Sequence, residues 1–350
     1  MKIGKLLLLI ILVCMLLTSC GVKTAAASGE KPVEAEDFMM GTTILQKVYG
    51  SGAEKAVEET SARMKEIEEL MTINAPGGEI NRLNEAAGKN EVALSAETLN
   101  ILETAKRYGE LSGGAFDVTV GPLVKAWGVF TDHPRVPPQG EINRLLKLVD
   151  FRTLTIDEAA SAARLERPGQ MVDLGGIAKG YAGDEAIRIY KEHGVKSAYI
   201  NLGGNVVVLG ARPDGSPWRI GIQNPRAANG MYIGILKVTD TVVVTSGDYE
   251  RYFESNNVRY HHILDTKTGY PADSGLISTT IVTDVSMDAD ALSTAAFVLG
   301  LDKGMKLVES LKGVEAIFVT KDKQVYVTPG LKSSFTFEDE SKEFNYAQKG

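Results

Sequence analysis

The hydrophobic positions of residues 53–71 recur at the period of an α-helix. Glu and Lys residues fill the positions between them, which predicts an amphipathic helix with one apolar face. The apolar positions are Val57, Met64, Ile67 and Met71. The same pattern predicts a helix from Ser95 to the glycine pair at 113–114, and another from about residue 178 to residue 193 that ends at Gly194.

The pattern changes between residues 197 and 283. Its apolar segments are short, rich in Val, Ile, Tyr and Thr, and separated by Gly, Pro or Asn, which is typical of an antiparallel meander. Helical periodicity returns at 287–299 and near 303–311, and two strand-like runs follow at 315–319 and 324–327. Helices and strands therefore form separate blocks, and the predicted fold class is α+β, an antiparallel β-sheet with helices packed on it.

Residues 1–19 read as an export signal. Lys2 and Lys5 precede an apolar run from Leu6 to Leu17, which is too short to span a bilayer. The sequence Leu17-Thr18-Ser19-Cys20 resembles a bacterial lipobox, in which Cys20 is lipidated and becomes the mature N-terminus. The alternative is an ordinary signal peptide that contains a cysteine.

Composition supports one globular domain behind that leader. Residues 20–35 are small and polar and predict a flexible tether, residues 36–332 contain no linker and predict a single large domain, and residues 333–350 predict a polar tail that frays. The net charge of -7 disfavours nucleic acid as a partner. Both cysteines, Cys14 and Cys20, lie in the leader, so thiol chemistry and disulfides are excluded from the mature domain.

A candidate anion site follows the strand-like run at 171–173. Asp173 is followed by a glycine turn at Gly175 and Gly176 and then by a helix with Lys179 in its first turn. Backbone N–H groups at a helix N-terminus and a lysine both attract phosphate. A plain tight turn explains the glycines equally well.

A candidate metal site begins at the helix near residue 287. Asp290 and Thr294 are four residues apart and share a helix face, with Ser293 between them. One carboxylate with hydroxyls is a weak oxygen set of the kind that Mg²⁺ accepts. Taken alone, the pattern favours capping, with Asp288 as the N-cap and Asp290 close to the helix dipole.

The pair His261 and His262 supplies a candidate proton acceptor. Neighbouring side chains of a strand face opposite ways, so only one of the two faces a given site. An edge histidine without a role is the alternative. A nearby patch at a strand end contains Ser246, Asp248, Glu250 and Arg251, and such clusters are mostly solvated surface.

In their order along the chain, these motifs resemble the ApbE-type FAD:protein FMN transferases, extracytoplasmic enzymes that are often lipoproteins. The matching stretches are Met40-Gly41-Thr42-Thr43, GGAFDVTVGPLV from Gly113, DLGGIAKGYA from Asp173, NLGGNV from Asn201, SGDYER from Ser246, HHILDTKTGYP from His261 and DALSTAAFVLG from Asp290. They cover nearly all of residues 38–300. The resemblance implies an ApbE-like, T-fold-related domain.

The resemblance also implies a reaction and its residues. FMN would be moved from FAD to a Thr or Ser hydroxyl of a target flavoprotein in the presence of Mg²⁺, with release of AMP. Asp290, Thr294 and the carbonyl of Gly176 would be the metal ligands, which reverses the capping interpretation, and Ser293 stands where some relatives have Asp. The FAD contacts would be Met40, Asn74, Ala115, Phe116, Asp117, Asp173, Lys179 and Leu264.

A hydroxyl nucleophile needs a base. His262 is the candidate because it begins an H-x-x-D run, and Ser246 would help to place the phosphate. The expected partner is an exported or membrane-associated flavoprotein with a Ser/Thr-Gly-Ala-Thr-like acceptor segment, and the expected location is outside the cytoplasm, lipid-anchored to a bacterial cell membrane. Two alternatives stay open: an FAD pyrophosphatase that gives FMN and AMP, and a flavin-binding lipoprotein without catalysis.

Overall fold

The computed structural model describes residues 31–73, 76–228 and 230–347. The predicted leader, Cys20 and Asn74 lie outside these ranges. Within them, no helix is both long enough and apolar enough to cross a bilayer.

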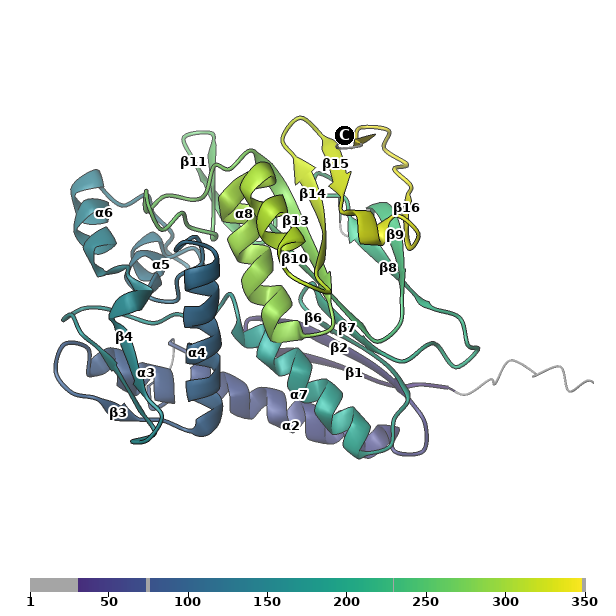
Figure 1. Ribbon diagram of the computed structural model, residues 1–350, viewed down its shortest axis with the longest axis horizontal. Coiled ribbons are helices and arrows are strands. Elements are labelled where there is room, and N and C mark those ends of the chain that lie inside the picture. The colour runs from purple at the N-terminus through teal and green to yellow at the C-terminus, as the bar shows by residue number, and fades with distance from the viewer. Residues whose placement is uncertain (1–30, 74–75, 229, 348–350) are drawn as a thin grey trace, which may run out of the picture. The chain divides into compact units, whose positions relative to one another are not determined.

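A nine-stranded sheet forms the centre of the fold, in the order β1-β2-β6-β7-β10-β13-β14-β15-β17 (Figure 1). Neighbouring strands are antiparallel except for β15 and β17, which are parallel. Its strands are β1 (Val33–Met39), β2 (Thr42–Tyr49), β6 (Ser197–Leu202), β7 (Asn205–Leu209), β10 (Thr241–Gly247), β13 (Leu276–Thr283), β14 (Glu315–Thr320), β15 (Gln324–Val327) and β17 (Asn345–Ala347).

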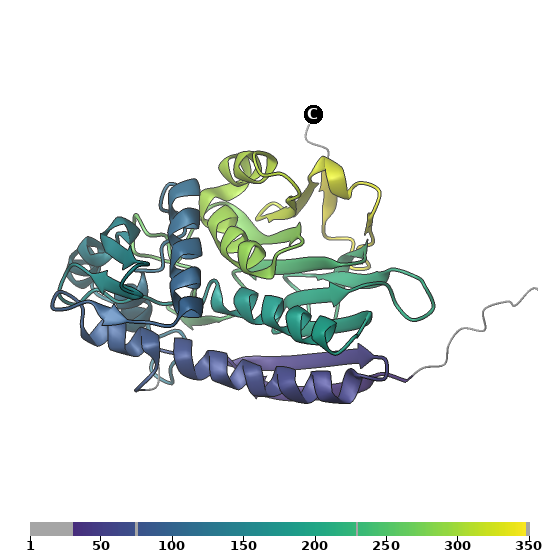
Figure 2. The ribbon, with the colours of Figure 1, turned by 60° about the horizontal axis from the view of Figure 1, so that its bottom comes forward.

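Three long helices cover one face of this sheet: α2 (Ala53–Met71), α7 (Ala178–Glu192) and α8 (Ser286–Glu309). In Figure 2, α2 and α7 run side by side, and α4 (Ala96–Leu111) stands against α8. All four were predicted from their hydrophobic period. Gly300, with a φ of 78°, interrupts α8 between the two helical stretches that the sequence indicated.

The central strands are buried on both faces, which explains why they read as unbroken apolar runs. In β7, Val207 joins the core under the helices, whereas Val206 and Val208 face the other way. There they meet a second sheet, whose strands are β8 (Trp218–Gln223), β9 (Tyr232–Val238) and β16 (Phe335–Phe337). The predicted meander is therefore interrupted, because β8 and β9 leave the main sheet between β7 and β10.

Most of the remaining elements surround one end of the helical layer. They are α3 (Glu79–Glu85), α5 (Gly121–Trp127), α6 (Gln139–Leu145), the small sheet of β3 (Val92–Ala93), β4 (Leu154–Asp157) and β5 (Ala162–Leu165), and the hairpin of β11 (Tyr252–Ser255) and β12 (Val258–His261). A separate apolar cluster around Trp127 joins α5 and α6 to this hairpin.

Two segments differ from the sequence-based expectation. The β1–β2 hairpin was not predicted, and the fold begins at Val33 rather than near Glu36. Residues 335–347, assigned to a fraying tail, contain β16 and β17, because Phe335 and Phe344 are buried against the second sheet.

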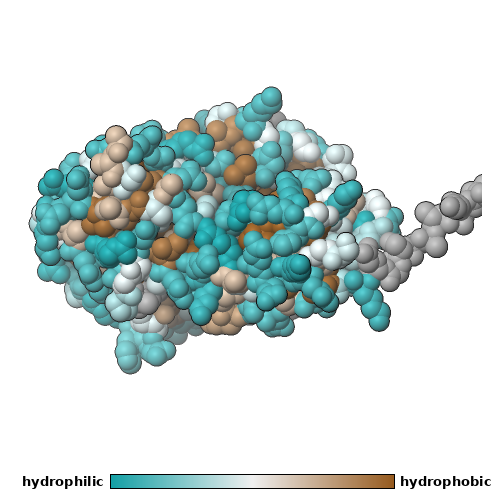
Figure 3. All heavy atoms as spheres, turned by 90° about the horizontal axis from the view of Figure 1, so that it is seen from below, coloured by the Kyte–Doolittle hydropathy of each residue, from teal (hydrophilic) through white to brown (hydrophobic). Residues whose placement is uncertain are grey.

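The face of the molecule that contains α2 is largely hydrophilic (Figure 3), as the exposed Glu and Lys residues of that helix require.

Candidate functional site

The N-terminal turn of α7 meets the first turns of α8. The backbone N–H of Gly180 donates to Asp290 Oδ2 at 2.9 Å, and Lys179 Nζ lies 3.8 Å from Asp290 Oδ1. Asp290 is only 3% exposed. A buried carboxylate is costly without partners, and here the helix N-terminus and the lysine both compensate its charge. The two motifs that the sequence presented separately therefore form one site.

Close packing of the two helices depends on glycine. A Cβ on Gly180 would lie 2.5 Å from the carbonyl oxygen of Ser286 and 2.8 Å from Asp290 Cβ, and a Cβ on Gly183 would lie 2.5 Å from Ser286 Oγ. Any larger side chain would push α8, and Asp290 with it, away from α7.

Asp184 of α7 fixes the start of α8, a role that sequence reasoning missed. Its Oδ1 accepts from the N–H of Ser286 at 2.8 Å and its Oδ2 from the N–H of Met287 at 2.9 Å. Asp288, the expected N-cap, instead pairs with Arg107 at 2.7 Å, and the helix has no side-chain cap of its own. The capping interpretation of the motif is therefore wrong: the cap comes from α7, and Asp290 is held from the side.

A chain of hydroxyls extends from α8 to the end of β10. Ser293 Oγ donates to the carbonyl of Asp290 at 2.9 Å, so it accepts from Ser246 Oγ, 2.8 Å away. Ser246 Oγ also lies 3.4 Å from Thr294 Oγ1. Ser293 is fully buried, so its hydroxyl is used only within this series of hydrogen bonds. Thr294 is partly buried and faces the glycine turn at Gly176.

Gly176 lies beside the hydroxyl of Thr294. A Cβ there would lie 3.4 Å from Thr294 Oγ1 and 3.2 Å from the ring of Phe116. The structure thus brings together Gly176, Lys179, Ser246, Asp290 and Thr294, with Phe116 at their margin.

Asp173 and Asp117 support the loops beside this set. Asp173 Oδ1 accepts from the N–H of Gly175 at 2.8 Å, and burial raises the pKa of Asp173. Both oxygens of Asp117 are already used, by Thr119 and by the N–H of Phe151. The side chains of Ala115, Phe116 and Asp117 are buried. Their contact with FAD stays a prediction, and it would be made by the backbone of these three residues.

The two histidines have different surroundings. His261 is 6% exposed, its Nε2 meets the carbonyl of Ala272, and its ring packs edge-on against Phe297. His262 is only partly buried, and its Nδ1 lies 3.2 Å from the carbonyl of Arg251. A carbonyl only accepts, so Nδ1 carries the proton and Nε2 keeps a free lone pair. His262 is therefore the one able to accept a proton.

Arg251 joins His262 to the β1–β2 turn. Its backbone carbonyl accepts from His262, and its guanidinium donates to the carbonyl of Gly41, next to Met40. Met40 adopts a φ of 53° and donates its N–H to Glu68 Oε1 at 2.9 Å. In the sequence, Arg251 belongs to a charged patch that was interpreted as solvated surface. Its contacts with His262 and Gly41 were therefore not predicted. Leu264 is 7% exposed and packs in the Trp127 cluster, so its predicted FAD contact is not tested by its position.

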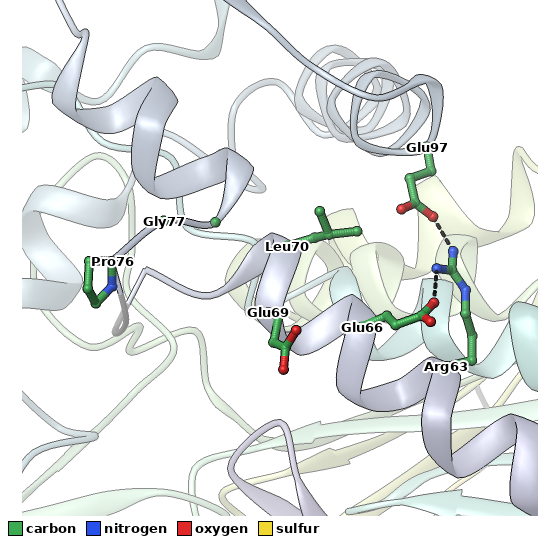
Figure 4. Close-up of a pocket in the computed structure, with 8 residues that line it drawn as sticks. Arg63, Glu66, Glu69, Leu70, Pro76, Gly77 and Glu97 are labelled. Atoms are coloured by element: carbon green, nitrogen blue, oxygen red, sulfur yellow. Dashed lines mark hydrogen bonds and ion pairs between the residues drawn. The ribbon is translucent and has the colours of Figure 1, made fainter.

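Two cavities in the described part of the chain are lined by residues outside this set. The first, of about 670 Å³, lies between α2, α3 and α4 (Figure 4). Its one cation, Arg63, already pairs with Glu66, Glu97 and Glu185, so it is poorly suited to a pyrophosphate. The second, of about 480 Å³, includes Asp248 and His261 and lies behind the strand that precedes His262.

Known proteins with similar sequences and structures share one description. A sequence model of the ApbE family matches residues 40–318. An FAD:protein FMN transferase of Klebsiella pneumoniae is 36% identical over 298 residues, covering 85% of this chain and 92% of its own. One of Treponema pallidum is 33% identical over 339 residues, covering 92% and 93%.

Solved structures agree. The ApbE protein of Thermotoga maritima superposes with a TM-score of 0.81 at 33% identity, over 87% of this chain and 99% of its own. The flavin transferase ApbE of Vibrio cholerae gives 0.78 at 29% identity, over the same shares. With the α+β architecture and the motifs in place, the chain belongs to the ApbE family.

Proposed function

We propose that this protein is an FAD:protein FMN transferase, which moves FMN from FAD to a Thr or Ser hydroxyl of a flavoprotein and releases AMP. The observation that carries the proposal is the meeting of Asp290, Thr294 and Gly176 with Lys179 at the N-terminus of α7. This arrangement suits a pyrophosphate, whose charge has to be neutralised during phosphoryl transfer.

The oxygen set fits Mg²⁺. The Asp290 carboxylate, the Thr294 hydroxyl and the Gly176 carbonyl would hold it, and the ion prefers such oxygen ligands together with phosphate oxygens. When bound, Mg²⁺ would neutralise charge on the FAD phosphates. The hydroxyl of Ser293 is already committed to the carbonyl of Asp290, and its lone pairs meet Ser246. We therefore assign the site one metal ion.

The transfer needs a positioned proton acceptor. The acceptor hydroxyl oxygen attacks the phosphorus of the FMN phosphate, its proton passes to His262 Nε2, and the bond from that phosphorus to the bridging oxygen breaks, so that AMP leaves with that oxygen. Desolvation, together with the positive charges of Lys179 and Arg251, lowers the pKa of His262 to about 3. The ring is therefore neutral over the physiological range, and the lone pair of Nε2 is free for the proton of the acceptor hydroxyl.

Tethering completes the proposal. Cys20 would carry the lipid, and the enzyme would act outside the cytoplasm on an exported or membrane-associated flavoprotein with a Ser/Thr-Gly-Ala-Thr-like segment. Metabolic labelling with a radioactive fatty acid tests this: we expect label on the wild-type chain and none on Cys20→Ser. Equal label on both would refute lipidation at Cys20.

One assay tests the reaction. The protein is incubated with FAD, Mg²⁺ and a carrier protein that contains a Ser-Gly-Ala-Thr segment, and covalent FMN and AMP are measured. We expect both products in equal amounts. Free FMN with AMP would identify a pyrophosphatase, and intact FAD would identify a flavin-binding protein.

Two variants test the assigned residues. Asp290→Asn is expected to abolish both the products and the Mg²⁺-dependent rise in Tm. The matched control Asp288→Asn, two residues earlier in the same helix and paired with Arg107, is expected to keep both. His262→Ala is expected to lower kcat by about 10²–10⁴-fold with FAD binding retained. Transfer by folded His262→Ala at the wild-type rate would exclude it as the base.

A further inference from the structure

Phe130 is a large apolar side chain left in solvent beside His262. It lies in the loop between α5 and α6 and is 57% exposed. Its ring meets that of His262 edge-on, with centroids 5.6 Å apart and planes at 71°. Because His262 Nδ1 is bound to the carbonyl of Arg251, the reactive Nε2 is the ring nitrogen still open to a substrate.

The loop that carries Phe130 is fixed by its own hydrogen bonds. Gly128 ends α5 in the left-handed conformation, with a φ of 61°. Its carbonyl accepts from the N–H and the hydroxyl of Thr131 at 2.9 and 2.8 Å, and the N–H of Arg135 donates to the carbonyl of Trp127 at 3.1 Å. The exposure of Phe130 is therefore a property of a folded turn.

An aromatic cluster beneath the loop sets the spacing between Phe130 and His262. Trp127, at the end of α5, packs against Phe253, Tyr260 and Tyr270 with centroids 5.4–6.4 Å away. Its indole N–H donates to the carbonyl of Gly269 at 2.8 Å. Phe253 and Tyr260 lie on the hairpin that leads into His262, so α5 and the hairpin are held as one unit.

We propose that Phe130 is a contact residue for the acceptor polypeptide, binding the segment that flanks the Ser or Thr to be modified. This inference rests on the function proposed above. A hydroxyl that reaches Nε2 brings its neighbouring residues within van der Waals reach of Phe130, since the two rings touch. A preorganised, exposed aromatic is also the kind of side chain that dominates protein–protein contacts.

The test compares Phe130→Ala and Phe130→Leu with wild type, using the carrier protein with the Ser-Gly-Ala-Thr segment as the varied substrate. We expect Phe130→Ala to raise KM for the carrier about tenfold, the effect of losing one interface anchor, with kcat retained, and Phe130→Leu to raise it less. Met231→Ala, which removes another exposed apolar side chain (39%) from the residue just before β9, is the control and should behave as wild type.

Three other outcomes would overturn the proposal. A fall in kcat at unchanged KM would mean that Phe130 acts only by positioning His262. Weaker FAD binding, measured by fluorescence titration, would mean that the ring contacts the nucleotide. Wild-type KM in both variants would mean that it contacts nothing. Failure of the proposed function is distinct, because wild type itself would then leave no covalent FMN on the carrier.

Discussion

His261 and His262 show how different contacts distinguish two chemically identical neighbours. The alternation of side chains along a strand predicts that they face opposite ways, and the structure places His261 against Phe297 and leaves His262 beside Arg251 and Phe130. Burial lowers the pKa of both. The outcome for His262 is a neutral ring with a defined tautomer.

This state of His262 predicts the pH dependence of the reaction. Because its pKa is lowered from 6.5 to about 3, the ring stays unprotonated as the pH falls from 7 to 5. The plot of kcat/KM for FAD against pH should therefore have no acid limb with a midpoint near 6.5, since kcat/KM reports the groups of the free enzyme. Initial rates at low FAD concentration check this, and a midpoint near 6.5 that disappears in His262→Gln would contradict it.

Gly180 is the position where backbone packing and chemistry coincide. Gly180→Ala would place a Cβ 2.5 Å from the carbonyl of Ser286, and the resulting overpacking should lower the free energy of unfolding by about 1–3 kcal/mol. Urea denaturation measures this, together with loss of transfer activity as Asp290 moves away.

Gly140→Ala is the matched control. Gly140 also lies in a helix, but a Cβ there meets nothing within 4 Å. Alanine should stabilise that helix by about 0.5–1 kcal/mol, because glycine loses more conformational freedom on folding. A Gly180→Ala variant that is no less stable than wild type would show that the clash at Gly180 is relieved.

The residues proposed to bind the metal and the phosphate were easier to predict from the sequence than the residues that hold them in place. Asp290 and Thr294 are paired by helical spacing, and Gly176 and Lys179 are joined by a turn, so their relation is local. Asp184 and Arg251 act on segments far away in the chain, Ser286 and Gly41. No local pattern encodes such partners, and polar residues of this kind are usually solvated.

At the scale of elements, α7 and α8 hold each other. The N-terminus of α7 binds Asp290 of α8, and Asp184 of α7 binds the N-terminus of α8. Removing the cap with Asp184→Ala should cost about 1–2 kcal/mol of stability, measured by urea denaturation.

The charge of Asp184 adds a pH dependence to this cap. Burial, with Asp288 and Glu185 nearby, raises the pKa of Asp184 from 3.8 to about 6. An acid whose pKa is raised on folding contributes stability below pH 3.8, and that stability is lost as the pH rises through 6. The cost of Asp184→Asn should therefore be smaller at pH 7 than at pH 4.5, and equal costs would show that the carboxylate titrates normally.

Helices were easier to foresee than edge strands. The period of α2 and α7 and the cap of α4, where Ser95 accepts from Thr98, are local signals. In β1 the inward positions include Asp37, which is satisfied by a hydrogen bond of 2.6 Å from Ser61 of α2. The polar residue on the inner face of β1 is explained by this contact with α2, which the sequence of the strand alone does not predict.

For the whole molecule, the second sheet and the C-terminal strands close the far face of the core. Phe335 lies on Gly234 of β9, where a Cβ would be 2.4 Å from its ring, and it is 8% exposed. Phe335→Ala should lower the free energy of unfolding by about 3 kcal/mol, measured by urea denaturation. Tyr346→Ala, at an exposed position (38%), is the control and should cost clearly less. A loss for Phe335→Ala as small as that expected for Tyr346→Ala would mean that the burial of Phe335 contributes little.

The pairing of β2 with β6 has a consequence for how the chain reaches this structure. Ile44 pairs with Leu202, so the N-terminal hairpin gains its neighbour only when more than half of the polypeptide is available. Contacts so distant in sequence slow folding, because the entropy of closing the loop is lost before the contact forms. The Met40–Gly41 turn belongs to that hairpin and bears on Arg251. Binding competence should therefore appear in the slowest refolding phase, after the helices have regained their circular dichroism.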